Sequence, residues 1–228
     1  PTMIDTNGIQ LAIYEGKPAG EAHPYPLILC HGMPELAYSW RHQFDALVEA
    51  GFHVIAPDMR GVGHSDAPPN KEDYKLNIRL NDLRGVLSHF GYEKAIFVGH
   101  DFGGAIVWGM GLYYPECVAG LISMNSPFAD MPINPVELYE IMYGPKNYFA
   151  YFQTKECEDK FNSDPARTFR FYMRKDTVNG HNLSRNKKPY TESMSPGSYT
   201  LLTLPTNKEH EKQVTPAHIR TTQKRRTV

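Results

Sequence analysis

The sequence of 228 residues predicts an α/β protein built around a mostly parallel sheet. Two observations carry this prediction. Short, continuous apolar runs recur through residues 1–128, and segments with a helical spacing of apolar residues separate them. Continuous apolar strands are typical of parallel sheets, because helices cover both faces of such a sheet. Strands that alternate with amphipathic helices indicate the α/β class.

The expected strands and helices follow one another in a regular order. In the first helix, Trp40, Phe44, Leu47 and Val48 recur at helical spacing, and Gly51 ends it as a C-cap. The second helix repeats this design, with leucines and a phenylalanine on one face and a closing glycine. The predicted strands are residues 9–16, 25–32, 52–63, 94–101 and 118–128, and the predicted helices are residues 38–51, 80–91 and a segment that begins near residue 103.

The character of the chain changes after residue 128, so we expect a boundary between residues 1–128 and 129–228. Proline and aromatic residues are frequent in residues 131–153, and residues 166–174 are expected to be helical. From about residue 175 the chain is polar and rich in turn-forming residues, without a sustained period. The basic segment 219–228 is interpreted as a solvated end.

Composition excludes several classes of function. The formal net charge is -1, which argues against a nucleic-acid partner. We find neither a signal-peptide pattern at the N-terminus nor an apolar run long enough to cross a bilayer. The three cysteines are widely spaced and fit neither a disulfide framework nor a metal site, so the sequence predicts a cytoplasmic protein. They are Cys30, Cys117 and Cys157, and the histidines at 31, 64 and 100 show no metal-ligand spacing either.

The segment VGHDFGG, residues 98–104, places a carboxylate at a sharp strand-to-helix turn. Asp101 stands between Gly99 and Gly103, which is the Gly-x-Asp-x-Gly form of a nucleophile elbow. In such a turn the N–H of the next residue, Phe102, and the start of the helix stabilise negative charge. The alternative is that Asp101 is an ordinary helix N-cap.

Three further motifs surround this turn, namely HGMPE at 31–35, APDMRGVGHSDAP at 56–68 and SMNSPF at 123–128. Together with the turn they resemble the α/β-hydrolase superfamily, and specifically its epoxide hydrolases. The resemblance is strongest over residues 27–128 and extends to about residue 175. It implies an α/β-hydrolase core, incomplete at its C-terminal side, with a helical cap in residues 129–228. It also implies an oxyanion hole made by the backbone N–H groups of Met33 and Phe102. His31, Gly32 and Pro34 are expected to support the loop that carries Met33.

An aspartate nucleophile suits this chemistry, because a carboxylate can attack an sp3 carbon and form an alkyl-enzyme ester. The resemblance implies that a cap tyrosine protonates the departing alkoxide. The segment YFAYFQ matches the family's pattern, so Tyr148 is the expected proton donor; the alternative is an ordinary cap aromatic. The expected substrate is a small apolar epoxide. We expect the protein to use neither a cofactor nor a metal ion. The expected pocket side chains are a tryptophan at position 109, in the helix after the elbow, together with Phe128, Tyr151 and Phe152.

Two local expectations concern the loops around Asp101. The side chain of His100 should point away from the site, as a packed core histidine rather than a catalytic one. Gly61-Val62-Gly63 is more typical of a turn than of a dinucleotide motif, because a third glycine is lacking. We also expect the Met33–Pro34 peptide to be cis, since the loop must turn sharply to aim the Met33 N–H at the oxyanion site.

The resemblance also implies a histidine that activates water and a second acid that orients it. No further strand–helix units follow SMNSPF, and Asn125 stands where related dehalogenases carry the acid. The expectation is therefore a truncated epoxide hydrolase with impaired turnover, whose last strand is an exposed edge that favours self-association. His181, His210 and His218 lie in polar surroundings and are poor substitutes for the base. The family's second cap tyrosine would fall near Thr221 or Thr222, where this chain has no tyrosine.

Two other functions remain open. A haloalkane dehalogenase shares the aspartate nucleophile, but that family typically has Asn and Trp where this chain has Met33 and Phe102. A fluoroacetate dehalogenase would carry Arg at position 102. The other open function is that of a binding or regulatory relative without turnover, which the absence of a recognisable catalytic histidine and second acid favours.

Overall fold

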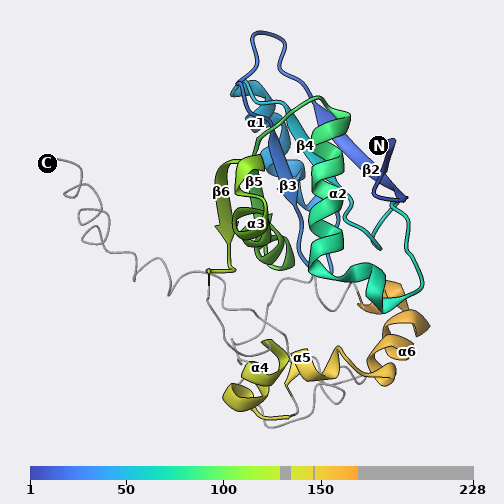
Figure 1. Cartoon of the computed structure of the whole chain (residues 1–228). Helices are drawn as coiled ribbons and strands as arrows, with labels where there is room; N and C mark the ends of the chain where they lie inside the picture. Colours follow the sequence, from blue (N-terminus) through green and yellow to red (C-terminus); the bar gives the residue numbers. More distant parts are fainter. Residues whose placement is uncertain (129–134, 146, 169–228) are drawn as a thin grey trace, which may run out of the picture. The chain divides into compact units, whose positions relative to one another are not determined.

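A computed structural model describes residues 1–128, 135–145 and 147–168 of the chain (Figure 1). The chain divides into two compact units, residues 1–130 and 131–228, and each is described by itself. Among the described residues, no helix is long and apolar enough to cross a membrane.

The first unit contains a six-stranded sheet in the order β1-β2-β4-β3-β5-β6. The strands β4, β3, β5 and β6 run parallel. At one side β2 pairs with β4 antiparallel, and β1 pairs with β2 antiparallel. The prediction of a mostly parallel α/β sheet is therefore confirmed. The strands span Thr2–Thr6 (β1), Ile9–Gly16 (β2), Leu27–Cys30 (β3), Val54–Pro57 (β4), Ala95–His100 (β5) and Val118–Met124 (β6).

The helices of this unit connect the parallel strands. The predicted helix at 38–51 forms a short 3-10 turn followed by α1, and Gly51 after it has a φ of 94°. The second predicted helix starts earlier than expected, at Leu76 rather than Leu80. The elements are η1 Ala37–Trp40, α1 Arg41–Glu49, η2 Lys71–Tyr74, α2 Leu76–His89, α3 Phe102–Tyr113 and η3 Pro115–Cys117.

The strand β1 was missed by the sequence analysis. Only Ile4 and Thr6 of its five residues are buried, because it lies at the edge of the sheet and covers one face only. A run this short and this polar carries too little period-2 signal to be recognised.

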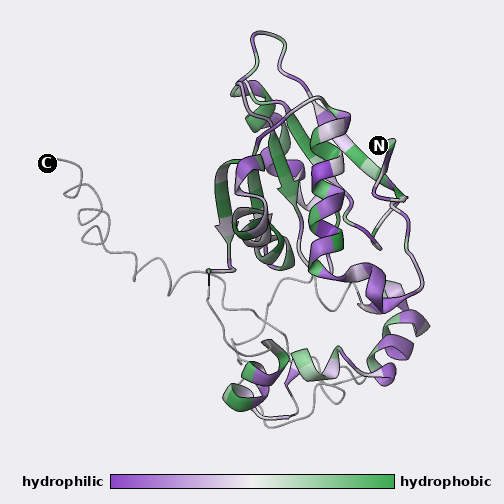
Figure 2. Ribbon diagram, viewed as in Figure 1, coloured by the Kyte–Doolittle hydropathy of each residue, from purple (hydrophilic) through white to green (hydrophobic). Residues whose placement is uncertain are grey.

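The two faces of the sheet are covered by different helices, and each face has its own core (Figure 2). Alternate residues of β3 belong to different cores: Leu27 and Leu29 pack toward Trp40 and α1, while Ile28 and Cys30 pack toward α2 and α3. Because successive side chains of a strand point to opposite faces, a strand covered on both sides must be apolar throughout. This explains the unbroken run LILC.

The second unit contains three described helices, α4 Pro135–Tyr143, α5 Tyr148–Tyr151 and α6 Lys155–Ser163. Two of them begin at polar caps. The side chain of Asn147 accepts a hydrogen bond from the Ala150 N–H (3.0 Å), and Thr154 accepts one from the Cys157 N–H (3.2 Å). The helix expected at 166–174 lies outside the described residues from 169 onward, as does the polar segment after 175.

Candidate active site

The strand register brings three chain segments to one edge of the sheet. Cys30 of β3 pairs with Gly99 of β5, and His100 pairs with Met124 of β6. Since these strands are parallel, the residues that follow each of them leave the sheet at the same edge. The motifs HGMPE, GHDFGG and SMNSPF therefore meet there, at the carboxyl ends of the strands, where open α/β sheets bind ligands.

Asp101 occupies a sharp turn between β5 and α3. Its φ of 53° and ψ of -118° lie in a region that residues other than glycine rarely adopt. Its carbonyl accepts hydrogen bonds from the Gly104 N–H (2.9 Å) and the Ser126 hydroxyl (2.6 Å). Asp101 occupies the N-cap position of α3, but its carboxylate makes no capping hydrogen bond to the helix, so it is not an ordinary side-chain N-cap. A strained backbone of this kind is typical of functional sites.

Two glycines allow this turn to be tight. A Cβ at Gly99 would lie 2.3 Å from the Gly103 carbonyl oxygen, and a Cβ at Gly103 would lie 2.1 Å from the Cys30 carbonyl oxygen. Both obstacles are backbone atoms that cannot rotate away. The spacing of Asp101 between two glycines is therefore a steric requirement of this turn.

The loop after β3 presents a hydrogen-bond donor to Asp101. The Met33 N–H donates to Oδ1 of Asp101 at 3.0 Å. The Met33–Pro34 peptide is cis, which confirms the expectation from the sequence. Phe102 is the first residue of α3, so its N–H is one of the donors that a helix leaves without an intrahelical acceptor. The site thus offers one donor in contact with the carboxylate and a second beside it in the chain.

His31 connects this loop to the loop after β4. Its Nε2 accepts a hydrogen bond from the Met59 N–H (3.0 Å), so the ring proton is on Nδ1, which donates to the Gly32 carbonyl oxygen (2.8 Å). Burial lowers the pKa of His31, which favours this neutral form. The neutral ring fixes the backbone of Gly32, immediately before the donor of Met33.

Asp58 holds the loop after β4 in place. The buried carboxylate accepts hydrogen bonds from the Ala37 N–H (2.9 Å) and the His64 N–H (3.1 Å). The segment between Asp58 and His64 is a turn, closed by the hydrogen bond from the Val62 N–H to the Met59 carbonyl (3.0 Å), as the sequence predicted for Gly61-Val62-Gly63. Asp58 thereby links the loop after β4 to the first residue of η1.

His100 is not the packed core histidine that we expected. Its side chain is 30% exposed, and Nδ1 donates to the Glu35 carboxylate at 3.1 Å. The side-chain amide of Asn125 lies 3.2 Å from its Nε2. The prediction was wrong because His100 is the last residue of β5, and its side chain meets polar side chains of the loops after β3 and β6 instead of the core. The hydrogen bond to Glu35 raises the pKa of His100 and lowers that of Glu35.

The tryptophan expected in the pocket lies one position earlier than predicted. Position 109 is Gly109, and the tryptophan of α3 is Trp108. Because successive residues of an α-helix are rotated by about 100°, these two positions face different neighbours. Gly109 is buried, and a Cβ there would lie 3.1 Å from Cδ2 of Leu80 and 3.3 Å from Cδ1 of Leu76, both on α2. The expectation for position 109 was therefore wrong, because the residue there is a glycine and the tryptophan is its neighbour, Trp108.

Trp108 and the expected pocket residue Phe128 meet beside the elbow. Their rings lie 5.3 Å apart, and the Trp108 indole N–H donates to the Ser126 carbonyl at 2.8 Å. Ser126 is the residue whose hydroxyl binds the Asp101 carbonyl. The structure therefore groups both aromatic side chains around the same short segment as the elbow.

The other expected residues lie in the second unit. Tyr148 begins α5 and Phe152 directly follows it, and their rings make an edge-to-face contact at 5.7 Å. Burial raises the pKa of Tyr151 to about 12, so this phenol stays neutral across the ordinary pH range. Ring contacts also join Tyr148 to Tyr139 and Phe149, which makes α4 and α5 an aromatic cluster.

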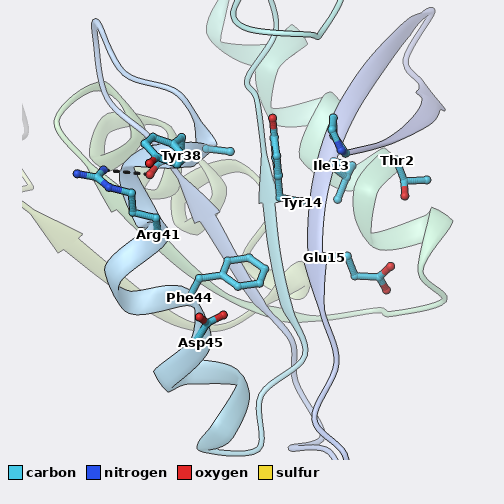
Figure 3. A pocket seen from close by; sticks show the side chains of 10 residues that line it. Thr2, Ile13, Tyr14, Glu15, Tyr38, Arg41, Phe44 and Asp45 are labelled. Atoms are coloured by element: carbon cyan, nitrogen blue, oxygen red, sulfur yellow. Dashed lines mark hydrogen bonds between the residues drawn. The ribbon is translucent and has the colours of Figure 1, made fainter.

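A pocket of about 610 Å³ lies elsewhere in the first unit, between β2 and the segment from η1 to α1 (Figure 3). The Arg41 guanidinium lies over the Tyr38 ring there, 4.7 Å from its centroid, and donates to the Tyr38 carbonyl. None of the expected site residues lines this pocket, so its location does not coincide with the elbow. The lining residues are Pro1, Thr2, Ile13, Tyr14, Glu15, Ala37, Tyr38, Arg41, Phe44 and Asp45.

Sequence reasoning missed Glu35 and the contact of Asn125 with His100. Glu35 closes the HGMPE motif, and its carboxylate accepts a hydrogen bond from the Gly32 N–H at 3.1 Å. The available signal was the position of polar residues after three strands whose carboxyl ends share one edge. That these polar residues lie close together could have been inferred from their positions, but which of them form hydrogen bonds with one another could not.

Comparison with known proteins agrees with this geometry. Residues 25–227 match the family described as the alpha/beta hydrolase fold. The chain is 42% identical over 172 residues to epoxide hydrolase A of Mycobacterium tuberculosis, covering 74% of this chain and 52% of that protein. It is 45% identical over 186 residues to bifunctional epoxide hydrolase 2 of Sus scrofa, covering 76% of this chain and 33% of that protein.

A solved structure gives the same result in three dimensions. The crystal structure of epoxide hydrolase A from Mycobacterium thermoresistibile has a TM-score of 0.68 and 41% identity, over 75% of this chain and 54% of that one. The chain thus spans about half the length of this relative. By its fold, its elbow and these comparisons, the chain belongs to the α/β-hydrolase fold family and is similar to the epoxide hydrolases within it.

Proposed function

We propose that this chain opens small apolar epoxides by nucleophilic attack of Asp101. The observation that carries the proposal is the hydrogen bond from the Met33 N–H to Oδ1 of Asp101, made by a carboxylate on a strained, glycine-flanked turn. A structural N-cap would direct its carboxylate to the helix instead. The names of the related epoxide hydrolases support the same assignment.

The proposed reaction uses the two carboxylate oxygens of Asp101 differently. Oδ2 attacks one epoxide carbon, the C–O bond to the ring oxygen breaks, and an alkyl-enzyme ester forms. Oδ1 becomes the carbonyl oxygen of that ester and keeps the Met33 N–H, joined by the Phe102 N–H. The alkoxide takes a proton from the phenol of Tyr148, which we propose as the donor from a cap formed by residues 129–228.

The character of the substrate follows from the side chains beside the nucleophile. Met33, Phe102 and Phe128 are each about half exposed, at 46%, 45% and 49%, and all are apolar. The nearby His100 is already paired with the Glu35 carboxylate, so its positive charge is not available to bind a substrate carboxylate. We therefore propose uncharged epoxides as substrates, with Trp108, Tyr151 and Phe152 as further pocket residues.

The second half-reaction, hydrolysis of the ester to a diol, needs an activated water. General-base assistance of this kind contributes about 10²–10⁴-fold. Among the described residues, His31 and His100 lie beside the elbow, and both ring nitrogens of each have hydrogen-bond partners. We therefore propose that these 228 residues by themselves form the ester faster than they hydrolyse it, so that the adduct persists.

The test is covalent labelling with a strained, activated aryl epoxide, read by intact-mass and peptide mass spectrometry. We expect one adduct per chain, on Asp101, that disappears in Asp101→Asn and is retained in Asp45→Asn, an exposed carboxylate on α1. Tyr148→Phe should slow labelling, whereas Tyr143→Phe, whose ring is 55% exposed, should not.

Two outcomes would contradict the proposal in different ways. A folded sample that never forms the adduct would favour a binding or regulatory relative without chemistry. Sustained diol formation over many turnovers would leave Asp101 as the nucleophile but show that a base acts that the described residues do not reveal. Halide release from a haloalkane, with no reaction on epoxides, would favour a dehalogenase.

A further inference from the structure

One carboxylate oxygen connects the oxyanion loop to the strand that carries the nucleophile. Oε2 of Glu35 accepts from the Gly32 N–H at 3.1 Å and from Nδ1 of His100 at 3.1 Å. Gly32 precedes the donor residue Met33, and His100 precedes Asp101. The residues immediately before Met33 and Asp101, namely Gly32 and His100, are therefore also connected, through the carboxylate of Glu35.

We propose that Glu35 and His100 are positioning residues for the Met33–Asp101 hydrogen bond, and that protonation of His100 strengthens the link between the two segments. This inference deepens the proposed function and rests on it for the role of Asp101. It assigns no contact with substrate to either residue, because each acts through the backbone of its neighbour.

The surroundings of His100 accommodate both protonation states. Its Nε2 faces the side-chain amide of Asn125, whose nitrogen lies 3.2 Å away and donates to a neutral ring. A half-turn of that amide would present its oxygen instead, which accepts from an imidazolium. Asn125 itself has a φ of 60°, a left-handed conformation that asparagine tolerates better than most residues. Asparagine therefore suits this position, whereas an aspartate would favour only the charged ring.

Charged groups on three segments define the pH range of the link. The Glu35 carboxylate raises the pKa of His100, and the charge of Asp101 acts in the same direction. His100 in turn lowers the pKa of Glu35, with smaller contributions from the Gly32 N–H and His31. The charged pair is therefore complete between the two folded-state pKa values. It weakens when the pH rises through that of His100, and also when the pH falls through that of Glu35.

The same contacts argue against His100 as the water-activating base. A base needs an unprotonated nitrogen aimed at the water that attacks the ester. Nδ1 is directed to Glu35 and Nε2 to Asn125, and the raised pKa keeps the ring charged over a wider range of pH. The geometry therefore suits a link between segments better than proton transfer.

The first experiment needs no turnover. NMR of the isotope-labelled protein follows the chemical shifts of the His100 ring and of the Met33 amide across a pH titration. We expect the Met33 amide to titrate with the pKa of His100, and Glu35→Gln to lower that pKa and uncouple the amide. His64→Gln, at an exposed histidine, should leave both signals unchanged. A Met33 amide that ignores the His100 titration in the unmodified chain would overturn the inference, whether or not the variant folds.

The second experiment measures the rate of Asp101 labelling against pH. We expect about a fivefold decrease as the pH passes the folded-state pKa of His100, the size expected when a charge-assisted hydrogen bond becomes a neutral one. His100→Gln should remove this inflection. If Asp101 is never labelled, the proposed function fails while the NMR coupling still stands. If labelling occurs with the same profile in His100→Gln, the positioning role fails.

Discussion

The backbone N–H of Met33 lies 3.0 Å from Oδ1 of Asp101, although 68 positions separate them in the sequence. This contact joins the two residues directly, so in the proposed reaction the donor for the ester carbonyl is in place before the substrate binds. Donors arranged in advance need no reorganisation during the reaction, which is the main reason that oxyanion holes are effective. The backbone of Asp101 is strained in the same arrangement, and this has a measurable consequence.

Glycine at position 101 should be more stable than alanine. The φ of 53° and ψ of -118° strain a residue with a Cβ by about 1–3 kcal/mol. We expect the free energy of unfolding of Asp101→Gly to exceed that of Asp101→Ala by about 1–2 kcal/mol. Urea unfolding measures the difference. At the exposed Ala105 of α3 the order should reverse, with Ala105→Gly less stable by about 1 kcal/mol. Equal stability of the two variants at 101 would contradict a strained turn.

Gly103→Ala should destabilise the protein strongly. Its Cβ would lie 2.1 Å from the Cys30 carbonyl oxygen, and neither backbone can move without separating α3 from β3. We expect a loss of about 3 kcal/mol or more, at the upper end of overpacking effects. Gly111→Ala, in the same helix, meets only the tip of Leu121 and should be neutral or slightly stabilising. Thermal unfolding of the two variants checks this, and a Gly103→Ala chain with unchanged Tm would refute it.

Stability should decrease on mild acidification, through His31 and His53. Both rings are buried, and burial lowers the pKa of each. At these two sites the unfolded chain binds more protons than the folded one as the pH falls through about 6.5, so their contribution to stability is lost in that direction. Each histidine contributes a slope of at most about 1.4 kcal/mol per pH unit.

Replacing His53 isolates its share of this slope. Its Nε2 lies 2.8 Å from Glu15 and its Nδ1 2.9 Å from the Tyr92 hydroxyl. We expect His53→Gln to unfold more easily at about pH 8 and to show a smaller loss of stability between about pH 7 and 5. His42→Gln, at an exposed position, should keep the original slope. An unchanged slope in His53→Gln would show that this histidine is not the titrating group.

Removing one partner of the buried pair Arg60–Asp82 should destabilise the protein strongly, whereas replacing both partners with apolar residues should not. The guanidinium donates to both carboxylate oxygens, at 2.8 and 2.6 Å, and both side chains are almost fully buried. Arg60→Leu leaves a buried, uncompensated carboxylate and should cost about 3–5 kcal/mol. The double variant with Asp82→Leu should recover most of that loss. Additive losses in the double-mutant cycle would show that the pair does not act as a unit.

Much of the fold and part of the candidate site follow from local patterns. Unbroken apolar runs identify strands that are covered on both faces, and the glycines around Asp101 identify a turn that only small residues permit. Such signals are contained within a few neighbouring residues, so the sequence alone determines them. The cis peptide before Pro34 belongs to the same group, because it is set by the loop that contains it.

The tertiary structure decided which polar side chains meet. Glu35 and His100 are 65 positions apart, and His100 and Asn125 are 25 apart. Their contacts depend on the parallel register of β3, β5 and β6, which fixes where each strand ends relative to its neighbours. The period of a strand tells which face a side chain takes, but not what lies beyond the last residue of the strand. For that physical reason the sequence located the sharp turn at Asp101, whereas the structure alone showed that the histidine before it joins Glu35 to Asn125.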